Sequence, residues 1–178
     1  YYGHLRRRAR VPVHHRDYRV VRYPGDRLPF MDGTFDGIIS NAVLQELPLP
    51  LERFAAEMAR VLKPGGVVDL SWHNFYSLTG HYRGEAEARR QPWGHLLGGR
   101  AHPDLNRATP DRVVAAFSEH FVDLRCTGQD RRCRLRGRHP DFQPEGEELL
   151  TPELAARLGD YPREWLLTRG YVLQARRR

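Results

Sequence analysis

Four side chains that can do chemistry lie close together in the middle of the sequence: His73, Tyr76, His81 and Tyr82. They follow a short apolar run, Val67–Ser71, which predicts a strand, on the side where open α/β sheets bind ligands. Imidazole titrates near neutral pH, so a histidine at this position could take a proton from a hydroxyl or an amine. We therefore predict that all four residues contact a substrate and that His73 and His81 are the candidate catalytic residues.

The sequence does not predict a metal site. Cys126 and Cys133 form no C-x-x-C pair, and none of the nine histidines is spaced as H-x-x-x-H or H-E-x-x-H. Two charged residues also have a structural interpretation. Asp36 opens a short strand and supports the turn before it, while Lys63 is a surface cation near the C-terminal end of a helix.

The composition is that of an ordinary globular protein. The 178 residues include 29 basic and 22 acidic side chains, a net charge of +7, and 40% of them are hydrophobic. No apolar run approaches the roughly 20 residues that cross a bilayer, so we expect a cytoplasmic protein without a membrane partner. Lys63 is the sole lysine, and the arginines are scattered. We interpret the charge as a composition bias and rank nucleic acid last among partners.

Short strands and helices alternate in the first half of the chain. A β-rich run at 18–23 and an apolar run at 37–40 predict two strands. Apolar residues recur at helical spacing over 51–62, and Pro64-Gly65-Gly66 is expected to end this helix with left-handed glycine backbone. Together with a strand at 67–71, this pattern predicts a βαβ unit, which is typical of a parallel sheet.

The second half of the chain predicts two more helices and two more strands, separated by insertions. Thr109-Pro110 and Thr151-Pro152 are each typical of an N-cap followed by the first helical turn. Residues without periodicity inside a compact domain indicate a binding insertion. We expect one partial domain over 1–178, divided into core motifs at 18–71, a substrate-side insertion at 72–108, a helix and strand at 109–126, a second insertion at 127–150, and a final helix and strand at 151–175.

Two stretches of sequence carry a resemblance to a known family. They read LPFMDGTFDGIISNAVL at 28–44 and ARVLKPGG at 59–66. Both resemble the class I S-adenosylmethionine-dependent methyltransferases of the type 11 group, where the first leads into the fourth strand and the second joins a helix to the fifth. Similarity to a subgroup with an insertion after the fifth strand extends the resemblance to about residues 20–175, through SLTGH at 77–81, PWGHL at 92–96, LNR at 105–107, LLTPE at 149–153 and LLTRG at 166–170.

The resemblance implies a fold, a cofactor and a site. The fold is an incomplete Rossmann-like, doubly wound α/β sheet, with strands 3 to 7 present, strands 1 and 2 missing, and an insertion after strand 5. The cofactor is S-adenosylmethionine, and the partner is a small-molecule methyl acceptor. The turn after the fourth strand would border the sulfonium, and the loop after the third would border the adenine. Carried onto this sequence, the cofactor-binding residues are Gly25, Asp26, Arg27, Ser40, Asn41, Ala42, Val43 and Gln45.

The sequence departs from the family at the cofactor site. Pro24 replaces the usual acid before the Leu-Pro-Phe motif, with Asp26 two residues later, and no G-x-G-x-G turn precedes that motif. In the family's strand order 3-2-1-4-5-7-6, loss of strands 1 and 2 would leave 18–23 without neighbours and 37–40 as an exposed edge. We predict that the chain folds its 4-5-7-6 half well and, alone, binds the cofactor weakly or not at all.

Three functions follow from these observations. The chain begins at Tyr1, without an initiator Met, and reads as the C-terminal portion of a methyltransferase that is inactive alone. The alternative is a truncated, non-catalytic homologue that acts as a binding or scaffolding subunit. A nucleic-acid methyltransferase or nucleic-acid binder is the third, suggested by a sequence pI near 9.9.

Overall fold

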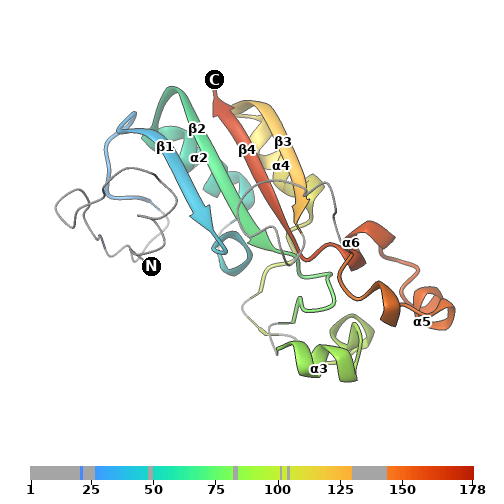
Figure 1. Ribbon diagram of the computed structural model, residues 1–178. Coiled ribbons are helices and arrows are strands. Elements are labelled where there is room, and N and C mark those ends of the chain that lie inside the picture. The colour runs from blue at the N-terminus through green and yellow to red at the C-terminus, as the bar shows by residue number, and fades with distance from the viewer. Residues whose placement is uncertain are drawn as a thin grey trace, which may run out of the picture.

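The computed structural model shows a four-stranded mixed sheet (Figure 1). β1 (Phe35–Asn41) runs parallel to β2 (Leu62–His73). β4 (Gly170–Arg177) pairs antiparallel with β2 on one side and with β3 (Phe121–Gln129) on the other, so the order is β1-β2-β4-β3. The structure describes residues 21, 27–47, 50–81, 84–100, 102–103, 105–129 and 144–178.

The strand order confirms the expected incomplete doubly wound fold. β1, β2, β3 and β4 stand where the fourth, fifth, sixth and seventh strands of the family are expected, so the order reads 4-5-7-6. β1 forms one edge of the described sheet, and the side chain of Ile39 on it is 83% exposed. The strand expected at 18–23 lies outside the described residues, apart from Val21.

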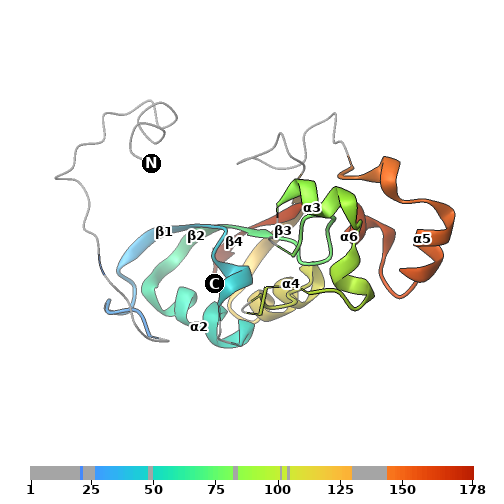
Figure 2. The same ribbon diagram turned by 90° about the horizontal axis from the view of Figure 1, so that it is seen from below.

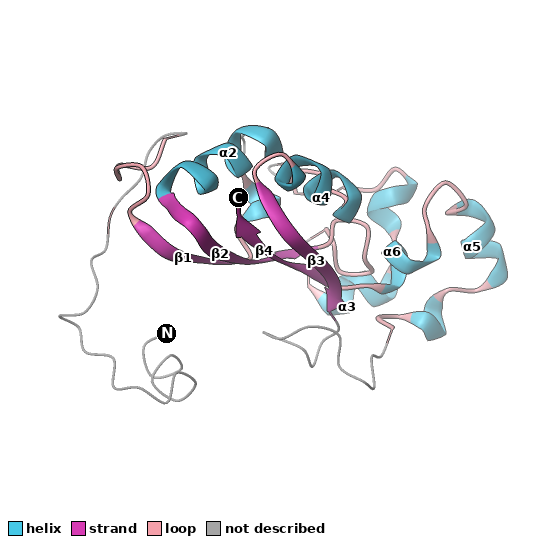
Figure 3. Cartoon of the chain, turned by 90° about the horizontal axis from the view of Figure 1, so that it is seen from above, coloured by secondary structure: helices cyan, strands magenta, loops and turns pink. Residues whose placement is uncertain are grey.

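Two helices cover one face of the sheet (Figure 3). α2 (Leu51–Val61) lies within the predicted helix, and α4 (Pro110–Ser118) lies beside it. The rings of Phe54 and Phe117 meet edge to face between them, with centroids 6.2 Å apart. Within the described part of the chain, no helix is long and apolar enough to span a membrane. The main core therefore lies between these helices and the buried sheet residues Val68, Leu70, Trp72, Phe121, Tyr171 and Leu173.

The opposite face of the sheet carries paired polar side chains. The Gln174 amide donates to Asp69 Oδ2 over 2.8 Å, between β4 and β2. The Arg176 guanidinium pairs with Asp123 at 2.6 Å, between β4 and β3. Along these strands, the apolar residues thus face the helices and the polar residues face the opposite side of the sheet.

The predicted end of α2 is wrong. Leu62 adopts an extended conformation and begins β2, so Pro64-Gly65-Gly66 lies inside the strand rather than at the helix C-terminus. The pairing register with β1 shifts between Phe35 and Gly37, and Gly65 has φ of +77°. The left-handed Gly65 therefore lies in an irregular part of the sheet, and α2 continues directly into β2.

The predicted N-cap of α4 is confirmed. Thr109 Oγ1 accepts the N–H of Arg112 at 3.3 Å, and Pro110 occupies the first turn. We expect Thr109→Ala to lower the free energy of unfolding by about 1 kcal/mol, because a helix N–H loses its partner. Urea denaturation of the variant measures this loss. Ser118→Ala, which removes an exposed hydroxyl at the other end of α4, is the control, and equal stabilities of the two variants would contradict the prediction.

A second, smaller core lies at the carboxyl ends of β1 and β2 (Figures 1 and 2). Short helices build it: α3 (Glu85–Arg90), a 3-10 helix (Gly94–Leu97), α5 (Pro152–Arg157) and α6 (Arg163–Leu167). α3 and the 3-10 helix show that the insertion expected at 72–108 contains short helices, which leave no periodic signal in the sequence. The buried residues of this second core are Leu78, Ala88, Trp93, Leu158, Leu166 and Leu167.

Candidate active site

The turn after β1 lies at the carboxyl end of the sheet, where cofactor-binding residues are expected. Ala42 has a left-handed conformation, with φ of +55°. Its N–H donates to the Ser71 carbonyl over 2.8 Å, and the Ser71 hydroxyl donates to Asn41 Oδ1 over 2.7 Å. Asn41, Ala42 and Val43 are all exposed. Non-glycine residues keep such a conformation only where surrounding contacts impose it, so this turn is a fixed, solvent-facing surface.

Gln45 supports this turn from inside. Its side chain is 2% exposed, and its Nε2 donates to the Ala42 carbonyl over 2.8 Å. Its Oε1 accepts the N–H of His73 at 3.2 Å. Its backbone carbonyl accepts the N–H of Asn106 at 2.8 Å. Gln45 therefore joins the end of β1, the end of β2 and the loop before α4, so its contacts are those of a positioning residue.

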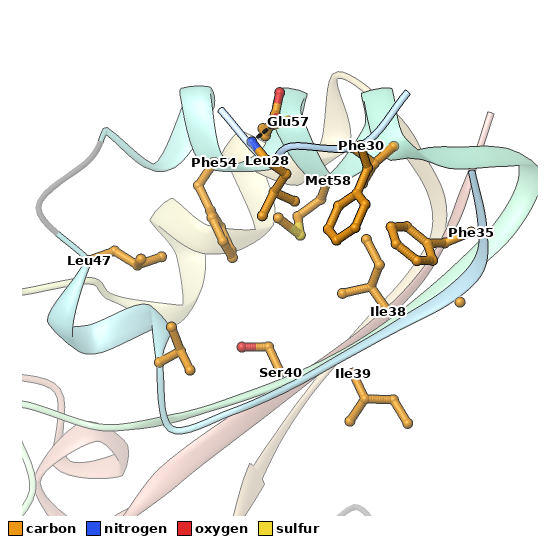
Figure 4. A pocket seen from close by; sticks show the side chains of 13 residues that line it. Leu28, Phe30, Phe35, Ile38, Ile39, Ser40, Leu47, Phe54, Glu57 and Met58 are labelled. Carbon is orange, nitrogen blue, oxygen red and sulfur yellow. Dashed lines mark hydrogen bonds between the residues drawn. The ribbon is translucent and has the colours of Figure 1, made fainter. Parts of the chain in front are cut away.

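Ser40 and Val43 line an apolar pocket of about 400 Å³ between β1 and α2 (Figure 4). Glu57 lies at this pocket, and its carboxylate accepts the N–H of Leu28 at 2.6 Å. Ile39 points to the other side of β1. The outer edge of the sheet is thus apolar on both sides of the strand. Further walls of the pocket come from Phe30, Phe35, Ile38, Phe54 and Met58.

The two stretches that carry the family resemblance contact each other through Arg60. Its Nη1 donates to the Phe30 carbonyl over 2.8 Å and pairs with Asp32 at 2.7 Å, and its Nη2 donates to the Leu28 carbonyl over 3.0 Å. Hydrogen bonds from Arg60 lower the pKa of both Glu57 and Asp32. Arg60 therefore holds the Leu-Pro-Phe segment against α2, a role that motif spacing alone did not indicate.

The expected adenine loop is described only at its end. Arg27 is exposed and lines a shallow pocket together with residues 28–32 and Arg60. Gly25 and Asp26 lie outside the described residues, as does Tyr82 of the expected substrate side.

His73 is the last residue of β2, and a backbone carbonyl sets its tautomer. Its Nε2 lies 3.1 Å from the Thr79 carbonyl oxygen. A carbonyl only accepts, so Nε2 carries the proton and Nδ1 the basic lone pair. Burial lowers the pKa of His73, and the nearby Arg169 and His81 act in the same direction. The imidazole is therefore neutral at physiological pH, the form that a general base requires.

A buried polar network that sequence reasoning missed lies behind His73. Thr79 Oγ1 lies 3.4 Å from His73 Nε2 and donates to the Glu145 carboxylate at 3.1 and 3.2 Å. Glu145 is 8% exposed and faces Arg169, whose Nη1 lies 3.6 Å from its Oε1. Through Thr79, the network contacts the His73 ring. The two ends of the Thr79–Glu145 contact are 66 positions apart, so no local pattern could predict it.

His81 is buried rather than open to solvent. Its side chain is 4% exposed, and its ring centroid lies 5.2 Å from that of His95. His95 Nε2 contacts the Phe75 carbonyl oxygen at 2.8 Å, and burial lowers the pKa of His95 to about 4. Among the described residues no three His, Cys, Asp or Glu side chains gather as a metal site would require. His81 and His95 are therefore buried next to each other beneath the loop that follows β2.

Tyr76 belongs to a group of three half-buried rings, which we call the Tyr76 cluster. Its ring centroid lies 5.5 Å from that of Tyr161 and 5.1 Å from that of Trp165. The Tyr76 hydroxyl lies 3.4 Å from the Arg107 carbonyl oxygen, and burial raises the pKa of Tyr76. Both Tyr161 and Trp165 come from the α5–α6 region, which the sequence does not connect with the substrate side. The predicted residues Tyr76 and His81 thus lie in the loop that follows His73, the last residue of β2.

The described residues fit one side of S-adenosylmethionine. The exposed turn at 41–43 stands at the carboxyl end of two parallel strands, where open α/β sheets place their ligands. The side-chain oxygen of Asn41 accepts the Ser71 hydroxyl, so its side-chain nitrogen can donate a hydrogen bond to a ligand. The glycine-rich turn and the ribose-binding acid that the family resemblance implies are not among the described residues. The described turn at 41–43 therefore forms one side of a cofactor site and does not by itself enclose the cofactor.

Comparison with known sequences agrees with the resemblance. Residues 4–69 match the family model of the methyltransferase domain, of the type 11 group. An uncharacterized methyltransferase of Mycobacterium sp. strain JLS is 39% identical over 122 residues, which cover 57% of this chain and 48% of that protein. One of Mycobacterium tuberculosis is 39% identical over 75 residues, covering 38% of this chain and 29% of that protein. The chain thus spans about half the length, or less, of these relatives.

Comparison with solved structures supports the fold. A Thermotoga maritima protein described as an S-adenosylmethionine-dependent methyltransferase, and a possible histamine N-methyltransferase, superposes with a TM-score of 0.50. It is 14% identical in sequence, and the match covers 86% of this chain and 60% of that protein. At this identity the likeness concerns the fold alone, and it agrees with the class I methyltransferase sheet.

Proposed function

We propose, for a chain related to the class I S-adenosylmethionine-dependent methyltransferases, that the full-length protein transfers a methyl group from S-adenosylmethionine to a small-molecule acceptor. One observation supports this most directly. The fixed turn at 41–43 and the end of β2 meet at the carboxyl edge of two parallel strands, and Gln45 holds them together. This is the position at which an open α/β sheet holds a ligand.

The cofactor would supply a methyl group already activated on a sulfonium, so this chain's residues have mainly to bind and orient. The backbone of Asn41, Ala42 and Val43 borders the cofactor, with Asn41 as a polar contact and Val43 as an apolar one. Gln45 does not touch it but fixes the Ala42 backbone. Correct placement of two reactants can account for most of such a rate enhancement.

The loop after β2 supplies the acceptor side. If the acceptor loses a proton on methylation, His73 is the candidate base, because its burial keeps it neutral and the Thr79 carbonyl fixes its tautomer. Tyr76 presents an apolar ring at the same loop. His81 lies deeper and supports the loop through His95. The chain of residues 1–178 by itself would offer one wall of the cofactor site and bind the cofactor weakly.

Isothermal titration calorimetry with S-adenosylmethionine tests the proposal. The full-length protein should bind it with a measurable affinity, and residues 1–178 alone at least tenfold more weakly. Gln45→Leu in the full-length protein should weaken binding at least fivefold, because the Ala42 carbonyl loses its donor and the turn relaxes. Glu46→Gln, at the exposed neighbouring position, is the matched control.

Two results would contradict the proposal. Absence of S-adenosylmethionine binding by the full-length protein would favour the alternative of a non-catalytic binding or scaffolding subunit. Equal weakening by Gln45→Leu and Glu46→Gln would mean that the β1 turn is not part of the cofactor site.

A further inference from the structure

The Tyr76 cluster is a preorganised surface. Its three rings come from two segments, the loop after β2 and the region of α6, and Asn74 joins these segments. The Asn74 amide nitrogen donates to the carbonyls of Trp165 and Thr168, each over 2.7 Å, while its oxygen accepts the N–H of Tyr76 at 3.0 Å. Asn74 is fully buried. Asn74 thus fixes the backbone of Tyr76 relative to that of Trp165, and the Tyr161 ring packs against the Tyr76 ring.

Trp165 differs from the other two tryptophans of the chain. Trp72 is 2% exposed and Trp93 is 0% exposed, each inside one of the two cores. Trp165 is only half-buried, and so are Tyr76 and Tyr161. Aromatic rings are large apolar groups, and three partly exposed ones in contact mark a surface suited to stacking.

Positive charge lies beside these rings. Arg107 and Arg112 are exposed, and both guanidinium groups act on the Tyr76 hydroxyl. Across the parts of the chain that the structure describes, neither guanidinium has a carboxylate at ion-pair distance. The Arg107 guanidinium lies instead over the Phe75 ring, 5.2 Å from its centroid.

Two acidic residues on the neighbouring helices act on groups of the sheet. Asp111 and Glu164, on α4 and α6, influence Tyr171 and Cys126 on the sheet side. Among the described residues, the charged groups that act on the Tyr76 hydroxyl are Arg107 and Arg112. A guanidinium without a carboxylate beside an aromatic surface offers two paired N–H donors to an incoming carboxylate.

The same surface lies next to the turn after β1. Asn106, which precedes Arg107, donates its backbone N–H to the Gln45 carbonyl over 2.8 Å and its side-chain amide to the Leu44 carbonyl over 2.6 Å. The Tyr76 hydroxyl reaches the Arg107 carbonyl. Arg107 therefore lies between the proposed cofactor side and the aromatic rings.

From this arrangement we infer that the surface formed by Tyr76, Tyr161, Trp165, Arg107 and Arg112 binds a planar aromatic carboxylate. The ring stacks on the Tyr76 cluster, and the carboxylate meets the guanidinium groups. Binding follows from the local geometry. That the bound acid is the methyl acceptor rests on the proposed function.

Calorimetry with three probes at low ionic strength tests the inference on the full-length protein. 2-Naphthoate carries both the ring and the charge, 2-naphthamide keeps the ring without the charge, and cyclohexanecarboxylate keeps the charge without the aromatic ring. We expect 2-naphthoate to bind at least fivefold more tightly than either analogue. The double variant Arg107→Gln, Arg112→Gln should weaken 2-naphthoate at least fivefold and leave 2-naphthamide unchanged, whereas Trp165→Leu should weaken both.

Arg90→Gln on α3 is the matched control, since Arg90 is exposed and, among the residues that the structure describes, its side chain hydrogen-bonds to the Ala86 carbonyl of its own helix. It should leave all three affinities unchanged. Equal affinities for 2-naphthoate and its analogues, or no binding of 2-naphthoate, would overturn the inference, and this comparison needs no variant. Titration of S-adenosylmethionine into the same sample separates the two proposals. Its binding without 2-naphthoate binding refutes this inference alone, and the reverse refutes the proposed function alone.

Discussion

Replacing Asn74 by aspartate is expected to lower the free energy of unfolding by about 4 kcal/mol. The Asn74 side chain is fully buried, and its nitrogen donates to two carbonyls, those of Trp165 and Thr168. Aspartate has the same shape but no donor, so both carbonyls lose a partner and face a negative charge. Each buried polar group left unsatisfied costs about 1 to 3 kcal/mol, and a charged one costs more. Guanidinium chloride denaturation of the protein, followed by far-UV circular dichroism, measures the change.

Gln91→Glu provides the control, because it makes the same amide-to-acid change at an exposed position. It should shift the free energy of unfolding by less than about 0.5 kcal/mol. A loss below about 1 kcal/mol for Asn74→Asp would show that the 74–81 loop repacks without its link to α6, and would contradict the rigid Tyr76 cluster described above.

The sequence predicted the strands of the described sheet because each strand contains a short apolar run or alternates apolar and polar residues. The 37–40 and 67–71 runs lie within β1 and β2, and β3 begins within the helix and strand expected at 109–126. The Thr109 and Thr151 caps are both confirmed, since a cap depends on a side chain and an N–H three residues apart. Local rules of this kind could be applied without knowledge of the fold.

The predictions from sequence were wrong or incomplete where a local pattern is compatible with more than one structure. A Pro-Gly-Gly run after a helix predicted a C-cap, but the left-handed Gly65 instead lies in an irregular part of β2. α6 escaped prediction because its five residues make little more than one turn.

The candidate site shows the same division between local and distant contacts. Its position at the ends of β1 and β2 could be predicted, because parallel strands place their carboxyl ends together. The support of Ala42 by Gln45, and of His73 by Thr79 and Glu145, could not. These are single hydrogen bonds between segments that only the tertiary fold brings together. His81 illustrates the limit, since its residue type could be read from the sequence but the burial of its side chain could not.

Acidification is expected to destabilise the protein through His95. Its pKa is about 4 in the folded protein, against 6.5 for an unperturbed histidine, because its ring is buried. Between these values the unfolded chain binds a proton that the folded protein does not, so stability falls as the pH falls. The contribution is fully present above pH 6.5 and lost by pH 4, a change of about 3 kcal/mol at 1.36 kcal/mol per pKa unit. His73, whose pKa burial also lowers, acts in the same direction.

His95→Gln isolates this contribution, because glutamine can still donate to the Phe75 carbonyl but does not titrate. The variant loses some stability at pH 7 through its smaller contact with the Phe75 ring, whose centroid lies 5.3 Å from that of His95. The free energy of unfolding, measured by urea denaturation from pH 7 to pH 4, should nevertheless fall less steeply for His95→Gln than for the unmodified protein. His102→Gln, at an exposed loop position, should retain the original slope. Parallel curves for His95→Gln and the unmodified protein would mean that the loop after β2 opens and lets His95 titrate in water before the protein unfolds.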